Sequence, residues 1–213
     1  MRSSYLALVT LLASSCWSSD WTIRTRRHIE GSPYEDAVYT QYLSGGWRRW
    51  DSGFPNGKLS LTRITDCSNQ RWIFLNHDDH TFQVVPAVVN VGVKKKIESR
   101  DTAERRDAFG FKARHVVQTT KYGPSRETIR DGWYVELPFS MECSATGNES
   151  ELGFAIEETV TERFPGQLKE TRTIDRVVDI SKTRLDPALF RIPRGYHSWN
   201  SWREKVKAFF SGP

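Results

Sequence analysis

The feature that most constrains the fold is an alternation of apolar and polar residues in short segments separated by turn residues. It is clearest in Thr81–Val84, where two apolar residues, Phe82 and Val84, alternate with polar ones. A period of two places every second side chain on the same face of an extended strand. Glycine and proline pairs such as Pro165-Gly166 separate these segments, as is typical of strands joined by turns. The chain is therefore predicted to be mainly β.

The same pattern predicts a series of strands along the chain. They cover residues 21–30, 34–43, 58–65, 71–75, 81–86, 91–99, 109–122, 129–137, 154–164 and 168–181. The clearest hairpin is Arg71–Pro86, whose polar turn is Asn76–His80. Asp101–Asp107 is highly charged and is expected to be a connecting loop or a short helical turn. Gly110 is expected to form a bulge inside its strand.

The C-terminal part of the chain departs from this pattern. Asp186–Phe190 is expected to form a short helical turn that docks Phe190 into the core. From Ser198 to Phe210, apolar residues recur at helical spacing and basic residues occupy the other side, which predicts an amphipathic helix. This tail, 198–213, either packs on its own domain or makes a peripheral contact with a membrane or a partner.

Residues 1–20 have the features of a secretory signal peptide. Arg2 supplies the positive charge, Tyr5–Ala13 is apolar, and small residues follow. Cys16 comes directly after Leu12-Ala13-Ser14-Ser15, which is similar to a bacterial lipoprotein box, although Ala13 stands where a larger aliphatic residue is usual. Two outcomes stay open: lipidation of Cys16, or ordinary cleavage nearby. In both, the chain is expected to be exported, to the periplasm or to the outer membrane.

Two further cysteines, Cys67 and Cys143, are predicted to form a disulfide bond. Thiols of exported proteins enter an oxidising compartment and pair there, and a single pair leaves one connectivity. Closing so long a loop would contribute about 4 to 5 kcal/mol in the chain-entropy model. The alternative is two buried thiols that lie too far apart to bridge.

The net charge of +5 is mild, and the basic residues are spread along the chain. A nucleic-acid-binding protein needs a denser basic patch or a recognisable module, so we expect no nucleic-acid partner. A solvated basic surface is the simplest interpretation, and attraction to anionic lipid head groups is the sharper one. The oligomeric state does not follow from the sequence.

No common catalytic or cofactor-binding motif occurs in the chain, including G-x-S-x-G, H-E-x-x-H and the phosphate-binding glycine loop. We therefore expect no catalytic residue, no metal ion and no cofactor. His77-Asp78-Asp79-His80 could meet a divalent cation, but a tight turn splays its side chains apart and suits Asp for local hydrogen bonds. Glu157, Glu158 and Glu162 could flank a sugar, but salt-bridged or solvated strand positions are the preferred interpretation.

Several stretches resemble a group of bacterial envelope proteins of unknown function. They are Leu61–Pro86, Phe109–His115, Asp131–Leu137 and the closing Leu185–Tyr196. These proteins are thought to share the fold of periplasmic lipoprotein carriers of the LolA/LolB kind. The resemblance implies a curved antiparallel sheet, or incomplete β-barrel, with an apolar concave face and short helical lid segments. It covers most of residues 35–196 and implies a half-barrel domain over 21–197. The carrier's cargo-releasing arginine matches no position here, so lipoprotein carriage is not implied.

With this fold, the apolar residues at alternating strand positions become candidate ligand contacts. They are Phe74, Phe82, Val84, Trp133, Val135, Phe154 and Ile156. They would line a groove for an acyl chain, a lipid or a lipidated partner protein, as apolar concave sites do. One rival is a structural or interaction lipoprotein of the envelope without a small ligand. The other is a hydrolase, which would need converging titratable groups around His77, His80 or His115.

Overall fold

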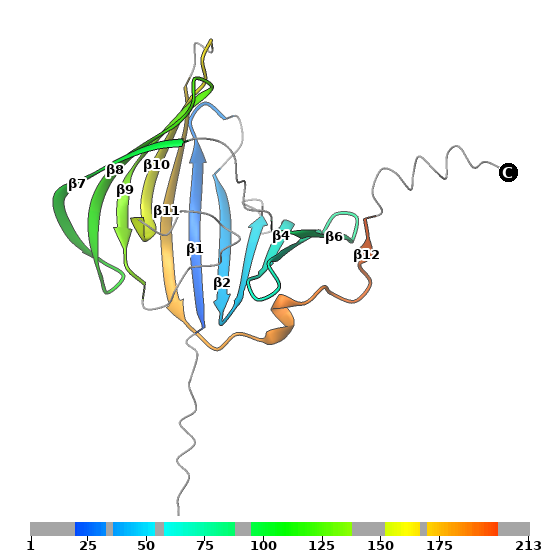
Figure 1. Ribbon diagram of the computed structural model, residues 1–213. Coiled ribbons are helices and arrows are strands. Elements are labelled where there is room, and N and C mark those ends of the chain that lie inside the picture. Colours follow the sequence, from blue (N-terminus) through cyan, green and yellow to red (C-terminus); the bar gives the residue numbers. More distant parts are fainter. Residues whose placement is uncertain are drawn as a thin grey trace, which may run out of the picture.

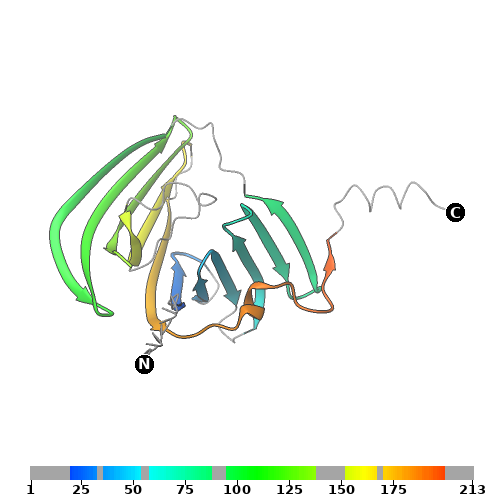
Figure 2. The same cartoon turned by 60° about the horizontal axis from the view of Figure 1, so that its bottom comes forward.

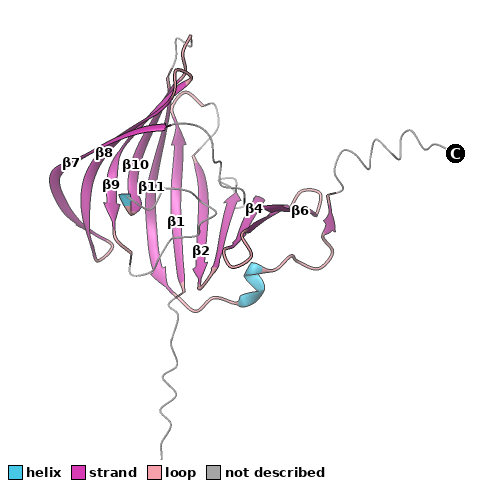
Figure 3. Ribbon diagram, in the orientation of Figure 1, coloured by secondary structure: helices cyan, strands magenta, loops and turns pink. Residues whose placement is uncertain are grey.

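The computed structural model describes residues 20–32, 36–53, 58–87, 95–137, 152–166 and 170–199 of the 213-residue chain. Strands dominate this part of the chain, and short turns join many of them (Figure 1, Figure 3). In chain order, the elements are β1 (Trp21–Ile29), β2 (Ala37–Ser44), β3 (Trp47–Gly53), β4 (Leu59–Asp66), β5 (Arg71–Asn76), β6 (Thr81–Pro86), β7 (Lys95–Ala108), β8 (Phe111–Tyr122), β9 (Arg126–Val135), β10 (Phe154–Arg163), β11 (Thr171–Lys182), the 3-10 helix η3 (Pro187–Phe190) and β12 (His197–Ser198).

These strands form one 12-stranded sheet in the order β12-β6-β5-β4-β3-β2-β1-β11-β10-β9-β8-β7. All neighbours are antiparallel except β12 and β6, which are parallel. β12 and β7 are the two edges, so the sheet bends but does not close into a barrel (Figure 2). The prediction of a mainly β chain with a curved antiparallel sheet is confirmed.

One aromatic contact shows how strongly the sheet curls. The rings of Trp21 on β1 and Phe111 on β8 have centroids 6.2 Å apart. Three strands separate β1 from β8 in the sheet order, and in a flat sheet four strand spacings would put them about 19 Å apart. Register shifts in β1, β3, β7 and β10 pairings mark bulges, which bend a sheet and increase its twist. The sheet therefore curls strongly between β1 and β8, so that these two strands approach each other across the inner face.

Two larger clusters of buried apolar residues, besides a small one around Ala87, stabilise the described part. One joins β1 and β2 to strands β8 to β11 and contains Ile23, Leu43, Ala113, Val135, Phe154, Ile156 and Val177. The other lies on strands β4 and β5 and contains Ile64, Ile73, Leu75 and Phe190. Phe190 comes from far along the chain, so the second cluster depends on the segment that follows β11.

That segment, residues 183–199, crosses strands β3 to β6, and we call it the C-terminal strap (Figure 1, orange). The Asp186 side chain accepts a hydrogen bond from the Ala188 N–H and caps η3. Arg49 on β3 donates to the carbonyl oxygen of Leu189 at 2.7 Å, and Phe190 is 6% exposed. The predicted turn that docks Phe190 into the core is confirmed.

A hydrogen-bond chain fastens the far end of the strap. The Tyr196 hydroxyl lies 2.5 Å from His77 Nδ1, and His77 Nε2 lies 2.8 Å from the Thr62 hydroxyl. Thr62 donates in turn to Asp51 at 2.5 Å. The chain is complete when neutral His77 accepts from Tyr196 and donates to Thr62. Burial is the main cause that lowers the pKa of His77, which favours this neutral form.

Two local expectations are corrected. Asp101–Asp107, expected to be a loop or helical turn, belongs to β7, which is charged because it is an edge strand. Gly110, expected to be a bulge, forms the β7–β8 turn with Phe109, and both residues have positive φ, 80° and 52°. Ser198, the first residue of the expected amphipathic tail, pairs with Phe82 in β12, while the helix expected in that tail lies outside the described residues and stays a prediction. In addition, β3 was not predicted, because glycines flank it on both sides.

Several sequence predictions lie outside the described residues. They concern the signal peptide up to residue 19 with Cys16, the tail from residue 200, and Cys143. Cys67 is disulfide-bonded in the structure, while its pairing with Cys143 stays a prediction. In the described ranges, no helix is long and apolar enough to cross a membrane.

Replacing Gly132 by alanine should destabilise the sheet. Gly132 on β9 lies opposite Glu158 on β10, and an added Cβ would come within 2.6 Å of the Glu157 carbonyl oxygen. Overpacking of this kind costs about 1 to 3 kcal/mol. Urea denaturation should show that loss in Gly132→Ala. The control is Gly46→Ala, whose Cβ meets only the Ser68 hydroxyl at 3.2 Å; equal effects in the two variants would contradict the explanation.

Acidification should weaken the fold partly through His77. The pKa of His77 is lower in the folded chain than the ordinary value of 6.5. Neutral His77 therefore contributes fully to the free energy of unfolding above pH 6.5, and this contribution is lost as the pH falls below that value and through the lower pKa of the folded chain. Denaturation at about pH 7.5 and about pH 5.5 should show a smaller loss of stability for His77→Asn than for the unaltered chain. His80→Asn is the control, and an unchanged pH dependence in His77→Asn would rule out this role.

Candidate functional site

The pairing register of β2 to β6 separates their side chains onto two faces. Five residues lie directly opposite one another on successive strands: Gln41, Trp50, Arg63, Phe74 and Gln83. Directly paired residues share a face, and so do residues two apart along a strand. We call this side the Tyr39 face. It comprises Ala37, Tyr39, Gln41, Leu43, Arg48, Trp50, Ser52, Leu61, Arg63, Thr65, Trp72, Phe74, Asn76, Thr81, Gln83 and Val85.

Aromatic side chains form a nearly continuous row across the Tyr39 face. The rings of Tyr39 and Trp50 have centroids 5.4 Å apart. The Arg63 guanidinium lies over Trp50, 5.9 Å from its centroid. Beyond Arg63, Phe74 packs edge-on against Trp72 with 6.3 Å between centroids. The row offers flat apolar surface interrupted by one cation.

This row is open to solvent at its centre. Leu61 is 52% exposed and Phe74 is 37% exposed, although both are large apolar residues. Leu61 lies beside Arg63 on β4, and Phe74 lies opposite Arg63 on β5. Neighbouring exposed apolar side chains on a folded domain typically mark a binding surface. The Tyr39 face of β3 to β5 is therefore the candidate functional site.

An ion pair closes the row on the β1 side. Arg27 on β1 donates two hydrogen bonds to Asp175 on β11, at 2.7 and 2.6 Å. The same guanidinium lies 5.1 Å from the centroid of the Tyr39 ring. Burial and the Asp175 carboxylate raise the pKa of Tyr39 well above its ordinary value, despite an opposing effect of Arg27. Tyr39 is thus a neutral, fixed ring that holds Trp50 in place.

A buried carboxylate lies directly opposite Asp175. Glu158 on β10 is 5% exposed and pairs with Asp175 across the strands. Like charges in this position repel unless each has a partner. Arg130 binds Glu158 at 3.2 Å and the Tyr134 hydroxyl donates to it at 2.5 Å, and burial, the largest cause, together with Glu158 raises the pKa of Tyr134. The carboxylates are held in structural ion pairs.

The other acidic candidates are separated from this pair. Glu157 lies on the opposite face from Glu158, where Arg106 and Arg176 bind it at 2.8 and 3.2 Å. Glu162 is paired with Arg126. The paired-carboxylate arrangement that a glycosidase needs is therefore not formed by these three glutamates, and each has the salt bridge that the sequence led us to expect.

The seven predicted ligand contacts do not line one groove. Val135, Phe154 and Ile156 are 1%, 8% and 3% exposed and belong to the core, with Trp133 packed against them. Phe82 packs against the cluster that holds the strap. Val84 is 44% exposed but lies on the face opposite Phe74, because Phe74 pairs with Gln83. Of the seven, Phe74 alone lies in the open aromatic row.

Sequence reasoning missed most of the row. Trp50 belongs to the unpredicted strand β3, and Tyr39 and Arg63 carry no periodic signal of their own. Leu61 lies in the predicted strand 58–65, but alternation within a strand does not say which residues of the next strand share its face. The missing information was the register between strands.

The histidines occupy separate places. His77 and His80 both contact the Tyr196 ring, with centroids 5.7 and 5.4 Å away, while His115 on β8 binds Asp131 at 2.7 Å. Hence the three do not converge on one site. Among the residues whose positions are described, no group of three or more His, Cys, Asp or Glu is placed to hold a metal ion.

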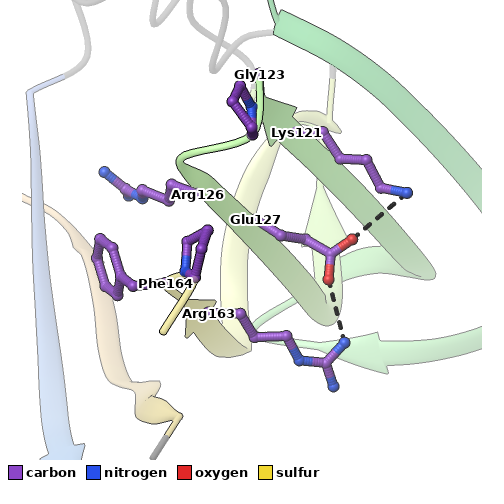
Figure 4. A pocket seen from close by; sticks show the side chains of 8 residues that line it. Lys121, Gly123, Arg126, Glu127, Arg163 and Phe164 are labelled. Carbon is purple, nitrogen blue, oxygen red and sulfur yellow. Dashed lines mark hydrogen bonds and ion pairs between the residues drawn. The ribbon is translucent and has the colours of Figure 1, made fainter. Parts of the chain in front are cut away.

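A pocket of about 330 Å³ lies at the far ends of β8 to β10 (Figure 4). Its lining includes Lys121, Arg126, Arg163, Glu127 and Phe164. Glu127 lies between two of the cations and binds Lys121 at 3.6 Å and Arg163 at 3.2 Å. Arg126 also pairs with Glu162 and Arg163 with Glu170, so each cation of the lining already has a carboxylate partner, and the pocket offers less than the Tyr39 face as a binding site.

No protein-family model matches this chain, and no curated protein matches it. Solved structures with a similar fold exist at low identity. An uncharacterised conserved protein from Thermus thermophilus has a TM-score of 0.51 and 12% identity, over 85% of this chain and 90% of that one. The structure of PNGF-II has a TM-score of 0.50 and 12% identity over 89% of this chain, which spans only 32% of that protein. At such identity, the likeness concerns the fold alone.

Two further solved structures have lower TM-scores. One is a putative outer membrane lipoprotein-sorting protein domain from Vibrio parahaemolyticus, with a TM-score of 0.41, 8% identity, and coverage of 81% of this chain and 89% of that one. The other is a LolA superfamily protein from Nitrosomonas europaea, with a TM-score of 0.35, 8% identity, and coverage of 82% and 90%.

Proposed function

We propose that this chain is an exported cell-envelope protein that binds a hydrophobic ligand, such as an acyl chain, on its Tyr39 face without catalysing a reaction. The observation that carries the proposal is the open row around Leu61 and Phe74. A side chain such as Phe gains about 1.5 to 3 kcal/mol when it leaves water. Exposed neighbours of this kind therefore favour a ligand that covers them.

The rigidity of the row supports a binding role. Tyr39 is buried and fixed by Arg27 and Asp175, and Trp50 packs against it. Trp72 supports Phe74 from the side. A preformed surface binds with less loss of side-chain freedom than a flexible one. The site can therefore accept an apolar chain without rearranging.

Export is supported by the predicted signal peptide and by the disulfide bond at Cys67. Structural disulfides persist in oxidising compartments and are rare in the bacterial cytosol. The names of two similar structures, a lipoprotein-sorting domain and a LolA superfamily protein, are in keeping with a location in the envelope.

Phe74→Ala should weaken ligand binding, while Val84→Ala should not. Both residues are exposed on the β5–β6 hairpin, at 37% and 44%, but on opposite faces. Loss of the phenyl contact should raise the Kd for a fluorescent fatty acid about tenfold or more. Equal binding by the two variants, or none by the delipidated chain, would instead favour an interaction protein without a small ligand.

Material purified from the native host should lack residues 1–15 or a similar leader and should carry one disulfide bond. Intact mass before and after reduction measures both properties, because reduction of one bond adds two hydrogens. A diacylglycerol on Cys16 would appear as a further mass, from which alkaline hydrolysis removes the two ester-linked acyl chains and leaves the thioether-linked glycerol. A full-length chain with Met1 would contradict export, and Cys143→Ser tests whether Cys143 is the partner of Cys67.

A further inference from the structure

The C-terminal strap, residues 183–199, has an apolar side and a charged side. Its apolar and aromatic side chains pack against the buried cluster on β4 and β5, and they are Leu185, Leu189, Phe190, Ile192 and Tyr196. This cluster lies on the face opposite the Tyr39 face, because Ile64 pairs with Ile73 whereas Arg63 pairs with Phe74. The other side of the strap therefore faces away from the sheet.

The side of the strap that faces away from the sheet carries positive charge. Lys182, which ends β11, is exposed, and so are the three arginines of the strap, Arg184, Arg191 and Arg194. Within the described part of the chain, none of these cations makes a hydrogen bond or an ion pair. They differ in this from cations such as Arg27, which forms a bidentate ion pair. The charge of the strap is thus available to a partner.

The strap has one carboxylate, and that group is used for local structure. Asp186 is the only Asp or Glu among residues 182–199, and its side chain caps η3 by accepting from the Ala188 N–H. Four cations and one carboxylate give this stretch a formal net charge of +3. A short segment of this charge on one side of a protein attracts an anionic partner.

The two ends of the strap indicate what kind of anionic partner fits. At the C-terminal end, the Trp199 side chain is 51% exposed, while its N–H is held by the Phe82 carbonyl oxygen at 2.7 Å. Exposed Trp suits the boundary between water and an apolar layer, as at a membrane interface. At the N-terminal end, the Leu185 N–H donates to Asp20, which follows Cys16 by four positions. A lipid on Cys16, one of the two outcomes that the sequence leaves open, would lie within about 14 Å of chain from Asp20.

We propose that the C-terminal strap docks the protein on the surface of an anionic phospholipid bilayer, with its cations over the head groups and Trp199 at the interface. Opposite charge attracts a basic segment to anionic lipids within a Debye length. Trp199 favours a bilayer over a soluble polyanion, because a bilayer offers an apolar layer beside its charges. With the strap on the membrane, the Tyr39 face points away from the bilayer. The inference goes beyond the proposed function and does not depend on an acyl ligand.

Cosedimentation with large vesicles tests the docking. The chain is purified after export with Cys16→Ser, so that no attached lipid contributes to binding. Vesicles of phosphatidylcholine with about 30% phosphatidylglycerol should bind it about tenfold or more tightly than phosphatidylcholine alone, since each cation near an anionic surface contributes about fivefold. Raising the salt concentration from about 0.1 M to about 0.5 M should remove most of this preference. Equal binding to the two kinds of vesicle would overturn the proposal.

Charge variants test whether the strap is the docking element. Replacing its three arginines by Gln should lower the affinity for anionic vesicles about tenfold or more. The matched control removes three cations from the exposed edge strand β7, as Lys95→Gln/Lys96→Gln/Arg100→Gln, and should keep most of the affinity. An equal loss in the control would mean that net charge alone acts, and the strap assignment would be wrong. Should the triple strap variant fail to fold, Arg191→Gln alone should still lower the affinity about fivefold, and no loss there would contradict the proposal.

Trp199→Phe and a soluble polyanion separate a bilayer from other anionic partners. Bromine-labelled phospholipid in anionic vesicles quenches Trp fluorescence at short range, so it should quench the unaltered chain more than Trp199→Phe. Equal quenching would contradict the position of Trp199 at the interface. Polyphosphate is the second probe. If it binds through the strap arginines while anionic vesicles do not bind, the partner is a soluble polyanion and the membrane assignment is overturned.

Discussion

The pairing register of the antiparallel strands determines which side chains of this sheet are buried and which are exposed. Because Phe74 pairs with Gln83 and Arg63, it faces the aromatic row, whereas its sequence neighbours Ile73 and Leu75 enter the core beneath the strap. A slip of one residue would exchange the two sets. The buried cluster and the open row are thus two consequences of one hydrogen-bonding pattern.

The two faces of the sheet differ in how far they are covered and in how their polar groups are used. Over β3 to β5, one face is covered by the C-terminal strap, with Arg49 and His77 tying it to the sheet. The other face keeps Leu61 and Phe74 in contact with solvent. Farther along the sheet, Glu158 and Asp175 are enclosed by arginine and tyrosine partners. These carboxylates are thus held in structural ion pairs, and the exposed apolar residues Leu61 and Phe74 are the more informative feature of the sheet.

The fold could be predicted from the sequence to a large extent, because alternation and turn residues are local signals. The β5–β6 hairpin and the Asp186–Phe190 turn were predicted for the right reasons. The charged part of strand β7, Asp101–Asp107, was not predicted to be a strand, because an edge strand lacks the apolar alternation of an inner strand. The site was harder still: Trp50, Arg63 and Phe74 come together only through pairing between strands. No local pattern encodes that register.

The edges of the sheet also determine how copies of this chain behave toward one another. An unpaired edge strand is a template on which other chains can add strands and polymerise. β7 presents a long edge with many charges and an irregularity between Asp101 and Arg105. At the other edge, β12 occupies Thr81 and Phe82 of β6, and Pro86 ends that strand without an N–H to offer. The protein can therefore keep apolar side chains exposed on one face and still resist edge-to-edge aggregation, even at high protein concentration.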